Sequence, residues 1–192
     1  MNEQLQFFHE FLKNPLNVGA ISPSSPALAA KMLADIQTDS DHIILEIGVG
    51  TGAVTRILQK KIPDKSCYLG IEINSSFVEC SQKEFPNLHI VCGDAGESEK
   101  IHAAMGLGEI KYIISGLPFA SLPLEISQSI LSEVDKFMAK GCLFRTFQYV
   151  HGYYLPPAVK FRKRMQEKYG KVKRSKVVLR NVPPAYTLTW QT

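Results

Sequence analysis

The stretch Glu46-Ile47-Gly48-Val49-Gly50-Thr51-Gly52 decides the fold that this sequence predicts. It follows an apolar run at 42–45, which predicts a buried parallel strand, and precedes residues 53–58, which predict the first turns of a helix. Three glycines at alternate positions leave no side chains where the strand turns into the helix. Such a turn is tight, and its backbone N–H groups can approach a ligand closely. It is typical of a nucleotide-type site at the carboxyl end of a sheet.

Apolar runs and helical periodicity alternate outward from this turn. They predict further strands at 66–72, 88–92, 111–114 and 141–149, helices at 5–12, 26–36, 74–85, 124–138 and 157–169, and a final antiparallel pair at 171–179 and 185–190. The alternation predicts an α/β fold with a Rossmann-like, doubly wound sheet of about seven strands. The sheet is expected to be mostly parallel, with an antiparallel C-terminal strand pair.

Length and composition indicate one globular domain spanning residues 1–192, with 45% hydrophobic residues. No apolar run reaches the roughly 18 residues of a membrane-spanning helix, and the N-terminus lacks a basic, apolar leader, so a cytoplasmic protein is expected. The four cysteines form no C-x-x-C pair and are expected to be buried, reduced thiols. The five histidines are scattered, and no metal site is expected.

The net charge of +4 conceals an asymmetry. Residues 156–180 hold ten Lys and Arg residues and a single acid, Glu167, so the rest of the chain is net acidic. A concentration of positive charge in one segment predicts a surface that faces phosphate. The alternative is a solvated helix followed by an edge strand.

Acidic residues end the next two predicted strands. Glu72 lies twenty residues after Gly52, where a carboxylate can accept both hydroxyls of a ribose. Asp94 ends the third strand and otherwise serves as a helix cap. Because these strand ends share one edge of the sheet, the acids and the glycine turn are expected to meet there.

The G-x-G-x-G spacing, with an acid two residues before its first glycine, resembles motif I of the class I S-adenosylmethionine (SAM) methyltransferases. That resemblance implies SAM as cofactor, S-adenosylhomocysteine as product, and contacts from Asp94 and Ala95 to the adenine. The cofactor-binding residues it implies are Glu46, Gly48, Val49, Gly50, Thr51, Gly52, Glu72, Ile73, Asp94, Ala95 and Ser115.

The motif Ser115-Gly116-Leu117-Pro118-Phe119 is similar to the N-L-P-Y or N-P-P-Y motif of enzymes that methylate the exocyclic amine of adenine. In those enzymes the asparagine carbonyl accepts a hydrogen bond from the target amine. Gly116 has no side chain, which argues against a nucleobase substrate. We expect the Leu117 backbone carbonyl to be unpaired and to face an amine; a plain proline-containing loop is the alternative.

Blocks spread over residues 7–186 resemble the bacterial phospholipid N-methyltransferases, which are related to rRNA adenine dimethylase-like proteins. The most specific are the G-A-I-S-P-S-S block at 19–25 and the R-N-V-P-P-A block at 180–185. The resemblance implies transfer of methyl groups from SAM to the amine of phosphatidylethanolamine, towards phosphatidylcholine. One departure is that residues 147–152 are F-Q-Y-V-H-G where the family usually has F-T-Y-G.

The acceptor amine must lose a proton, and Tyr149, His151 and Tyr153 are the candidates to accept it or to line the path of the amine, with the Leu117 carbonyl as a further catalytic contact. Of these, Tyr149 matches the family. Ser24, Ser25 and Arg180 are expected to contact the substrate. Arg180 pairs with the lipid phosphate or is a sheet-edge residue, and Tyr149 otherwise packs at a strand end. Ser25 is also expected to cap a helix that starts at Pro26.

A lipid acceptor implies a peripheral protein at the inner, cytoplasmic face of an anionic membrane, with no nucleic-acid partner, and we expect a monomer. Residues 1–40 are expected to form a helical lid or membrane-contact segment, and residues 41–192 the catalytic core. The cations expected to attract the lipid are Lys160, Arg162, Lys163, Arg164 and Lys168. The alternatives are an RNA adenine N6-methyltransferase and a non-catalytic SAM-fold binding module.

Overall fold

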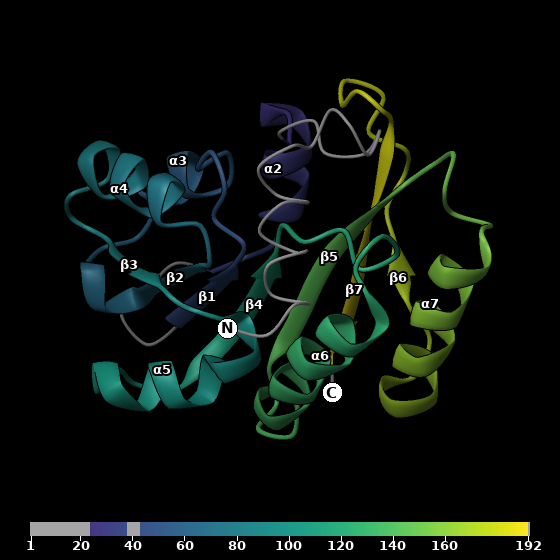
Figure 1. Ribbon diagram of the computed structural model, residues 1–192. Helices are drawn as coiled ribbons and strands as arrows, with labels where there is room; N and C mark the ends of the chain where they lie inside the picture. Colours follow the sequence, from purple (N-terminus) through teal and green to yellow (C-terminus); the bar gives the residue numbers. More distant parts are fainter. Residues whose placement is uncertain (1–23, 38–42, 192) are drawn as a thin grey trace.

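The computed structural model describes residues 24–37 and 43–191. In this part of the chain a seven-stranded sheet has the order β3-β2-β1-β4-β5-β7-β6 (Figure 1). The strands are β1 (Ile43–Ile47), β2 (Tyr68–Glu72), β3 (His89–Cys92), β4 (Ile110–Ser115), β5 (Leu143–Tyr149), β6 (Lys173–Arg174) and β7 (Ala185–Gln191). The first five are parallel, whereas β7 runs antiparallel to β5 and to β6. The predicted fold class is confirmed.

Helices cover both faces of the sheet (Figure 1). One face carries α2 (Pro26–Met32), α3 (Thr55–Leu58) and α4 (Ser75–Glu84), and the other carries α5 (Ser98–Met105), α6 (Leu124–Met138) and α7 (Pro156–Tyr169). The strands β1 and β2 are buried along their whole length because each is covered on both faces. The sheet order reverses between β1 and β4, and this switch point is where open α/β sheets bind ligands.

The predicted elements and the structure differ in a few places. The helix α5 was not predicted, because its eight residues are few and include only two large apolar side chains, Ile101 and Met105. The strand β6 is much shorter than expected, because the Ser175 hydroxyl takes over the bond to the Thr187 N–H (3.0 Å) and the backbone then leaves the ladder. The predicted helix at 5–12 lies outside the described residues.

The expectation that all four cysteines are buried is wrong for two of them. Cys67 and Cys142 are buried, but Cys80 and Cys92 are exposed. Cys80 lies on the solvent side of α4, and Cys92 ends β3, which is the edge strand of the sheet. Edge and surface positions leave these two thiols in contact with water.

Candidate functional site

The glycine turn after β1 needs glycine for two physical reasons. The backbone is left-handed at Gly48, Gly50 and Gly52, with φ of 78°, 55° and 73°, which side chains disfavour. A Cβ at Gly48 would lie 2.6 Å from Leu117 Cδ2, and one at Gly52 would lie 2.5 Å from the Phe85 ring. A Cβ at Gly50 would meet nothing within 4 Å. The turn is therefore packed at its two ends and open in the middle.

Glu72 is fixed against this turn at the end of β2. Its Oε2 accepts a hydrogen bond from the Gly50 N–H (2.9 Å), and its Oε1 accepts one from the Asn74 N–H (2.9 Å). The carboxylate is only 4% exposed, so its orientation is set by these two backbone donors. A carboxylate held in this way presents its remaining lone pairs to whatever lies beside the glycines.

A small cavity lies beside the glycine turn at the carboxyl ends of β1, β2, β3 and β4. Its lining includes five of the residues predicted to bind the cofactor and one predicted to be catalytic: Gly48, Glu72, Ile73, Asp94, Ala95 and Leu117. Ile71, Gly93 and Ile130 also line the cavity and were not predicted as site residues. Ile130 lies in the core-facing register of α6, and no local signal distinguishes it from an ordinary core residue.

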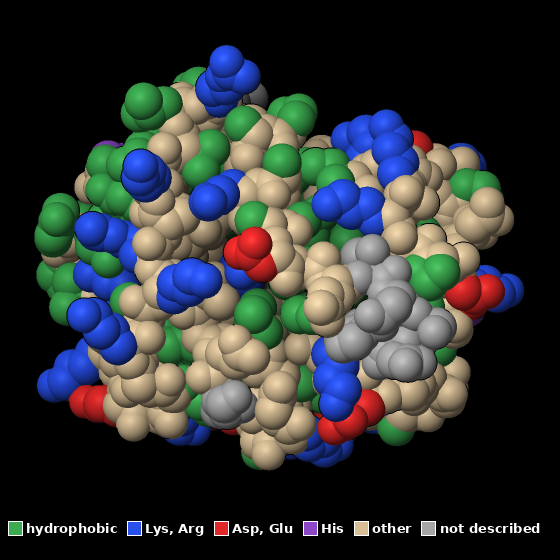
Figure 2. Space-filling view, turned by 180° about the vertical axis from the view of Figure 1, so that it is seen from behind, with side chains coloured by type: hydrophobic (Ala, Val, Ile, Leu, Met, Phe, Trp, Pro, Cys, Tyr) green, Lys and Arg blue, Asp and Glu red, His purple; other side chains and the backbone are tan. Residues whose placement is uncertain are grey.

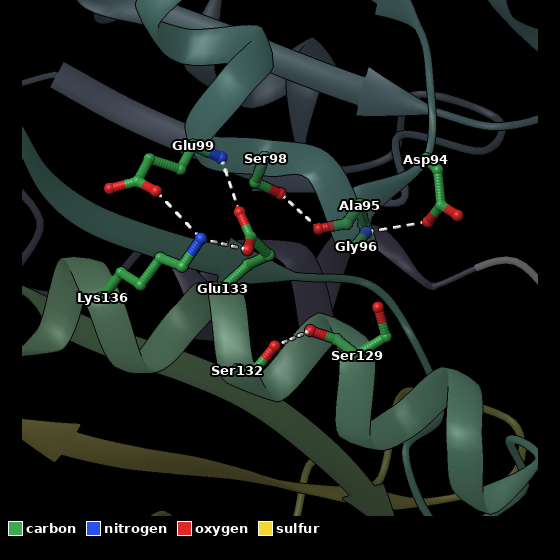
Figure 3. Close-up of polar contacts among 9 residues, drawn as sticks. All are labelled: Asp94, Ala95, Gly96, Ser98, Glu99, Ser129, Ser132, Glu133 and Lys136. Carbon is green, nitrogen blue, oxygen red and sulfur yellow. Dashed lines mark hydrogen bonds and ion pairs between the residues drawn. The ribbon is translucent and has the colours of Figure 1, made fainter.

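Asp94 leads into a short turn that packs on α6 (Figure 3). One of its carboxylate oxygens, Oδ1, accepts a hydrogen bond from the Gly96 N–H (2.8 Å), while no bond is drawn to the second oxygen. Asp94 therefore has the alternative role expected for it, that of a helix cap, and it also lines the cavity.

Glu133, on α6, holds this turn and the start of α5 in place (Figure 3). It is 7% exposed, accepts a hydrogen bond from the Glu99 N–H (2.8 Å) and forms an ion pair with Lys136 (2.7 Å). A carboxylate at a helix N-terminus satisfies an otherwise unpaired N–H group and interacts favourably with the helix dipole. Glu133 thus explains how the short α5 forms, and nothing in the local sequence predicts it.

Glu46 does not line the cavity. Its Oε2 accepts hydrogen bonds from Tyr68 Oη (2.7 Å) and Thr55 Oγ1 (2.9 Å), on the face of the sheet covered by α3. Burial raises the pKa of Glu46 to about 7, against the opposing effect of these two bonds. The acid of the motif thus connects β1 to the start of α3 and to β2, and so stabilises the turn between strand and helix.

Five other predicted cofactor residues also lie outside this lining: Val49, Gly50, Thr51, Gly52 and Ser115. The two glycines belong to the turn described above. Val49 is buried against Gly70, and Thr51 is exposed on the outer side of the turn. Ser115 is fully buried, and its hydroxyl accepts a hydrogen bond from the Leu117 N–H (3.2 Å). Ser115 therefore shapes the turn after β4.

We expect the substitution Glu46→Gln to change how stability depends on pH. Because the folded pKa (about 7) lies above the ordinary 4.5, the native state binds more protons than the unfolded state between these values. Wild-type stability therefore falls as pH rises from about 4.5 to 7, by up to roughly 3 kcal/mol from this group. Glutamine cannot ionise, so the variant lacks this pH-dependent loss. In urea unfolding, the free energy of unfolding of the variant minus that of the wild type should therefore increase as the pH rises across this range. A pH-independent difference would contradict the prediction.

A second cavity lies on the other side of the turn after β4. Its lining includes Pro118, Phe147, Tyr149 and His151, together with residues at the start of α7. The half-buried Tyr149 stacks on His151 (centroids 5.6 Å apart) and meets Phe147 edge-on. Burial raises the pKa of Tyr149, so its phenol is neutral at physiological pH. Leu117 lines the first cavity and Pro118 the second, so one turn separates them.

The expectation that the Leu117 carbonyl is unpaired is wrong. This oxygen accepts a hydrogen bond from the Phe119 N–H (3.1 Å) and a longer one from Thr146 Oγ1 (3.5 Å). The turn closes on itself after Pro118, so that the Phe119 N–H supplies the first donor, and the neighbouring strand β5 supplies the second through Thr146. An incoming amine would have to share this acceptor.

The residue that departs from the family pattern, Gln148, lines the second cavity and is anchored to α7. Its Oε1 accepts a hydrogen bond from Arg162 (2.6 Å), which also donates to the Tyr153 carbonyl (2.7 Å). The Arg162 guanidinium lies over the Tyr153 ring at 3.7 Å. Gln148 and Tyr153 therefore help to hold α7 against the sheet.

The two most specific sequence blocks meet in space. The Ser25 hydroxyl caps α2 by accepting a hydrogen bond from the Leu28 N–H (3.1 Å), as predicted. The Ser25 N–H donates to Asn181 Oδ1 (2.9 Å), and the Asn181 amide donates to the Pro183 carbonyl (2.7 Å). Ser24 precedes this cap and is half-buried, whereas Arg180 is exposed beside Asn181.

The basic segment is only partly available to an external anion, which corrects the prediction that it faces phosphate as a whole. Arg162 is buried, and Arg164 and Lys168 both pair with Asp135 on α6. Lys163 lies 3.9 Å from Glu167. Exposed cations of this segment without an ion-pair partner among the described residues are Lys160, Lys171, Lys173, Arg174, Lys176 and Arg180, of which Arg174 lies over the rings of Tyr153 and Tyr186. Figure 2 shows Lys and Arg side chains spread over the left half of the view, on the side of α7 and β6, with apolar side chains at its edge.

Neither a membrane-spanning helix nor a metal-binding cluster is found among residues 24–37 and 43–191. None of the helices there has both the length and the apolar character needed to cross a membrane. The same residues contain no group of three His, Cys, Asp or Glu side chains placed to hold a metal ion.

Comparison with known proteins agrees with this geometry. Residues 44–141 match the family described as a methyltransferase domain. An ornithine lipid N-methyltransferase from Singulisphaera acidiphila is 24% identical over 147 residues, which cover 75% of this chain and 77% of that protein.

Solved structures share the fold at low sequence identity. A SAM-dependent methyltransferase from Anabaena variabilis has a TM-score of 0.63 at 14% identity, covering all of this chain and 95% of that one. Magnesium protoporphyrin IX methyltransferase from Synechocystis, solved with bound SAM, has a TM-score of 0.59 at 12% identity, covering 86% and 76%. With the glycine turn, the ordered Glu72 and the switch-point cavity, these matches show that the chain belongs to the methyltransferase domain family and is a SAM-dependent methyltransferase.

Proposed function

We propose that this enzyme methylates the amine of phosphatidylethanolamine, at the inner face of an anionic membrane. The observation that carries the proposal is the second, mostly apolar cavity, which lies one turn away from the glycine site and contains Tyr149. The similarity to an ornithine lipid N-methyltransferase supports an amine-bearing lipid as the acceptor. The exposed cations near α7 and β6 provide attraction to anionic lipid, each contributing on the order of 1 kcal/mol near the surface.

The residues around the first cavity fit SAM. Glu72 is placed to accept hydrogen bonds from ribose hydroxyls, and the second oxygen of Asp94 from the adenine amino group, with Ala95 beside it. The open centre of the turn at Gly50 lets backbone approach the ligand. When bound, SAM supplies a methyl group that its sulfonium has already activated. The protein's contribution is then mainly to position the acceptor.

The acceptor amine must lose its proton before it attacks. The neutral Tyr149 phenol is a poor base, and we assign its oxygen to orienting the amine by a hydrogen bond. His151 stacks on this ring and is exposed to solvent, which suits it to pass the proton to water. Leu117 contributes through its position in the turn between the two cavities.

The site disfavours the adenine alternative. A Cβ at Gly116 would lie 2.7 Å from the Gly48 carbonyl oxygen, so an asparagine there would force the two turns apart. The position at which adenine N6-methyltransferases carry their amide is thus closed by backbone. An aliphatic amine has no planar ring to be oriented, so it does not need an asparagine at this position.

Substitutions in the glycine turn should separate packing from ligand binding. In Gly52→Ala the new methyl meets Phe85 and the φ is strained, so we expect both a loss of about 1–3 kcal/mol in unfolding free energy and weaker SAM binding. In Gly50→Ala the methyl meets no protein atom, so only about 1–2 kcal/mol of backbone strain is expected. Calorimetric titration should still show about tenfold weaker SAM binding. If Gly50→Ala bound SAM with wild-type affinity, the turn would not be part of the SAM site.

The substitution Tyr149→Phe removes the phenol oxygen and keeps the ring that stacks on His151. We expect kcat to fall about tenfold, because one hydrogen bond contributes on the order of 1 kcal/mol, with the Kd for SAM unchanged. The matched control is Tyr154→Phe, since Tyr154 is 78% exposed, and it should behave as wild type. An unchanged kcat in Tyr149→Phe would exclude the phenol from the reaction.

The acceptor is tested by incubating the protein with methyl-labelled SAM and vesicles that contain phosphatidylethanolamine and an anionic lipid. We expect labelled phospholipid, with a rate that falls as added salt screens the exposed cations. Parallel incubations contain ornithine lipid or RNA. Label in ornithine lipid alone would correct the head group, whereas label in RNA alone would overturn the lipid proposal.

A further inference from the structure

A groove of about 440 Å³ lies between the start of α6 and the start of α7. Its lining is mainly apolar and includes Phe119, Leu122, Leu124, Leu131, Pro156 and Phe161. Phe119 and Phe161 stack with their ring centroids 5.1 Å apart, so the floor is rigid and fixed to the core. The volume lies within the roughly 300–1,000 Å³ of pockets that bind small organic ligands.

This groove adjoins the cavity that contains Tyr149. Ala120, Ser121 and Pro157 line both spaces, at the point where the turn after β4 passes the first residues of α7. A lipid whose amine lies at Tyr149 would therefore have an apolar groove next to its head group, where an aliphatic chain could lie.

Cationic groups stand along one wall of the groove. Arg164 is held by Asp135 (2.7 Å) and is thereby neutralised. Lys160 is exposed, lines the groove, and has no ion-pair partner within residues 24–37 and 43–191. A ligand that combines an apolar chain with an anionic group next to it matches this arrangement in charge as well as in polarity.

Apolar side chains are also exposed on the two helices that form the groove. Leu124, which lines the groove at the start of α6, is 55% exposed. Leu155, which lines the cavity at Tyr149, is 57% exposed, and Val159 one turn further along the chain is 43% exposed. Single exposed apolar residues are ordinary, but exposed apolar side chains beside both spaces suit contact with an apolar phase.

We propose that the groove between α6 and α7 binds a fatty acyl chain of the acceptor lipid while its head group occupies the cavity at Tyr149. The proposal rests on the proposed function and adds to it that the enzyme recognises the chain and not the head group alone. Lys160 would pair with the lipid phosphate. The groove thereby selects lipids over soluble amines.

The test uses the substitution Gln128→Trp, which fills the groove from an exposed position on α6. The matched control is Ser132→Trp, one turn further along the same helix, exposed and outside the groove lining. Each protein is assayed with phosphoethanolamine and with phosphatidylethanolamines of increasing acyl length. The Kd for SAM checks that each variant is folded and retains its cofactor site.

In the wild type we expect kcat/KM to rise with acyl length, because each buried methylene contributes roughly fourfold in affinity. In Gln128→Trp the ratio of kcat/KM for the long-chain lipid to that for phosphoethanolamine should fall about tenfold, whereas Ser132→Trp should retain the wild-type ratio.

Equal ratios in the two variants, with the wild type active on lipid, would overturn the groove proposal and leave the proposed function standing. A wild-type enzyme that methylates RNA or soluble amines but no lipid would overturn both.

Discussion

The site depends on two backbone turns that press against each other at the switch point of the sheet. The Gly116 N–H donates to the Ile47 carbonyl (2.9 Å), and neither Gly48 nor Gly116 has room for a Cβ. This contact sets the distance between the cavity at Glu72 and the cavity at Tyr149. The Leu117 side chain lies against Gly48, and the Gly48 carbonyl lies against Gly116, so the turns after β1 and β4 pack directly on each other. Under the proposed function, this close packing keeps the methyl donor and the acceptor amine near each other.

The sequence was sufficient for the features that depend on local pattern. Buried parallel strands, the bounds of α6 and the cap at Ser25 follow from apolar periodicity and capping chemistry, and the structure has all of them. Glu72 and Asp94 lie at strand ends, where topology alone brings them beside the glycine turn. Such features are predictable because each is determined within a few residues or by a general rule of parallel sheets.

Features that depend on a distant partner were not predictable. Nothing near Arg162 shows that Gln148 and the Tyr153 carbonyl will bury it, and nothing near Arg164 or Lys168 points to Asp135. Counting charge along the segment therefore overstated the cationic surface. Likewise, Glu46 belongs to the motif, yet its carboxylate is used by Tyr68 and Thr55, whose positions become relevant only once β2 and α3 are packed.

The bond between Ser25 and Asn181 joins residues 156 positions apart. It links the beginning of α2 to the loop that carries Arg180, so these two segments are tied together. Asn181 is 1% exposed, and its side-chain carbonyl accepts a hydrogen bond from the backbone N–H of residue 25. Every residue type except proline would keep that N–H group at position 25. Variation at 25 is therefore limited by the cap alone, whereas variation at 181 alters the shape of two loops at once. Across homologues, position 181 should be the less tolerant of the pair.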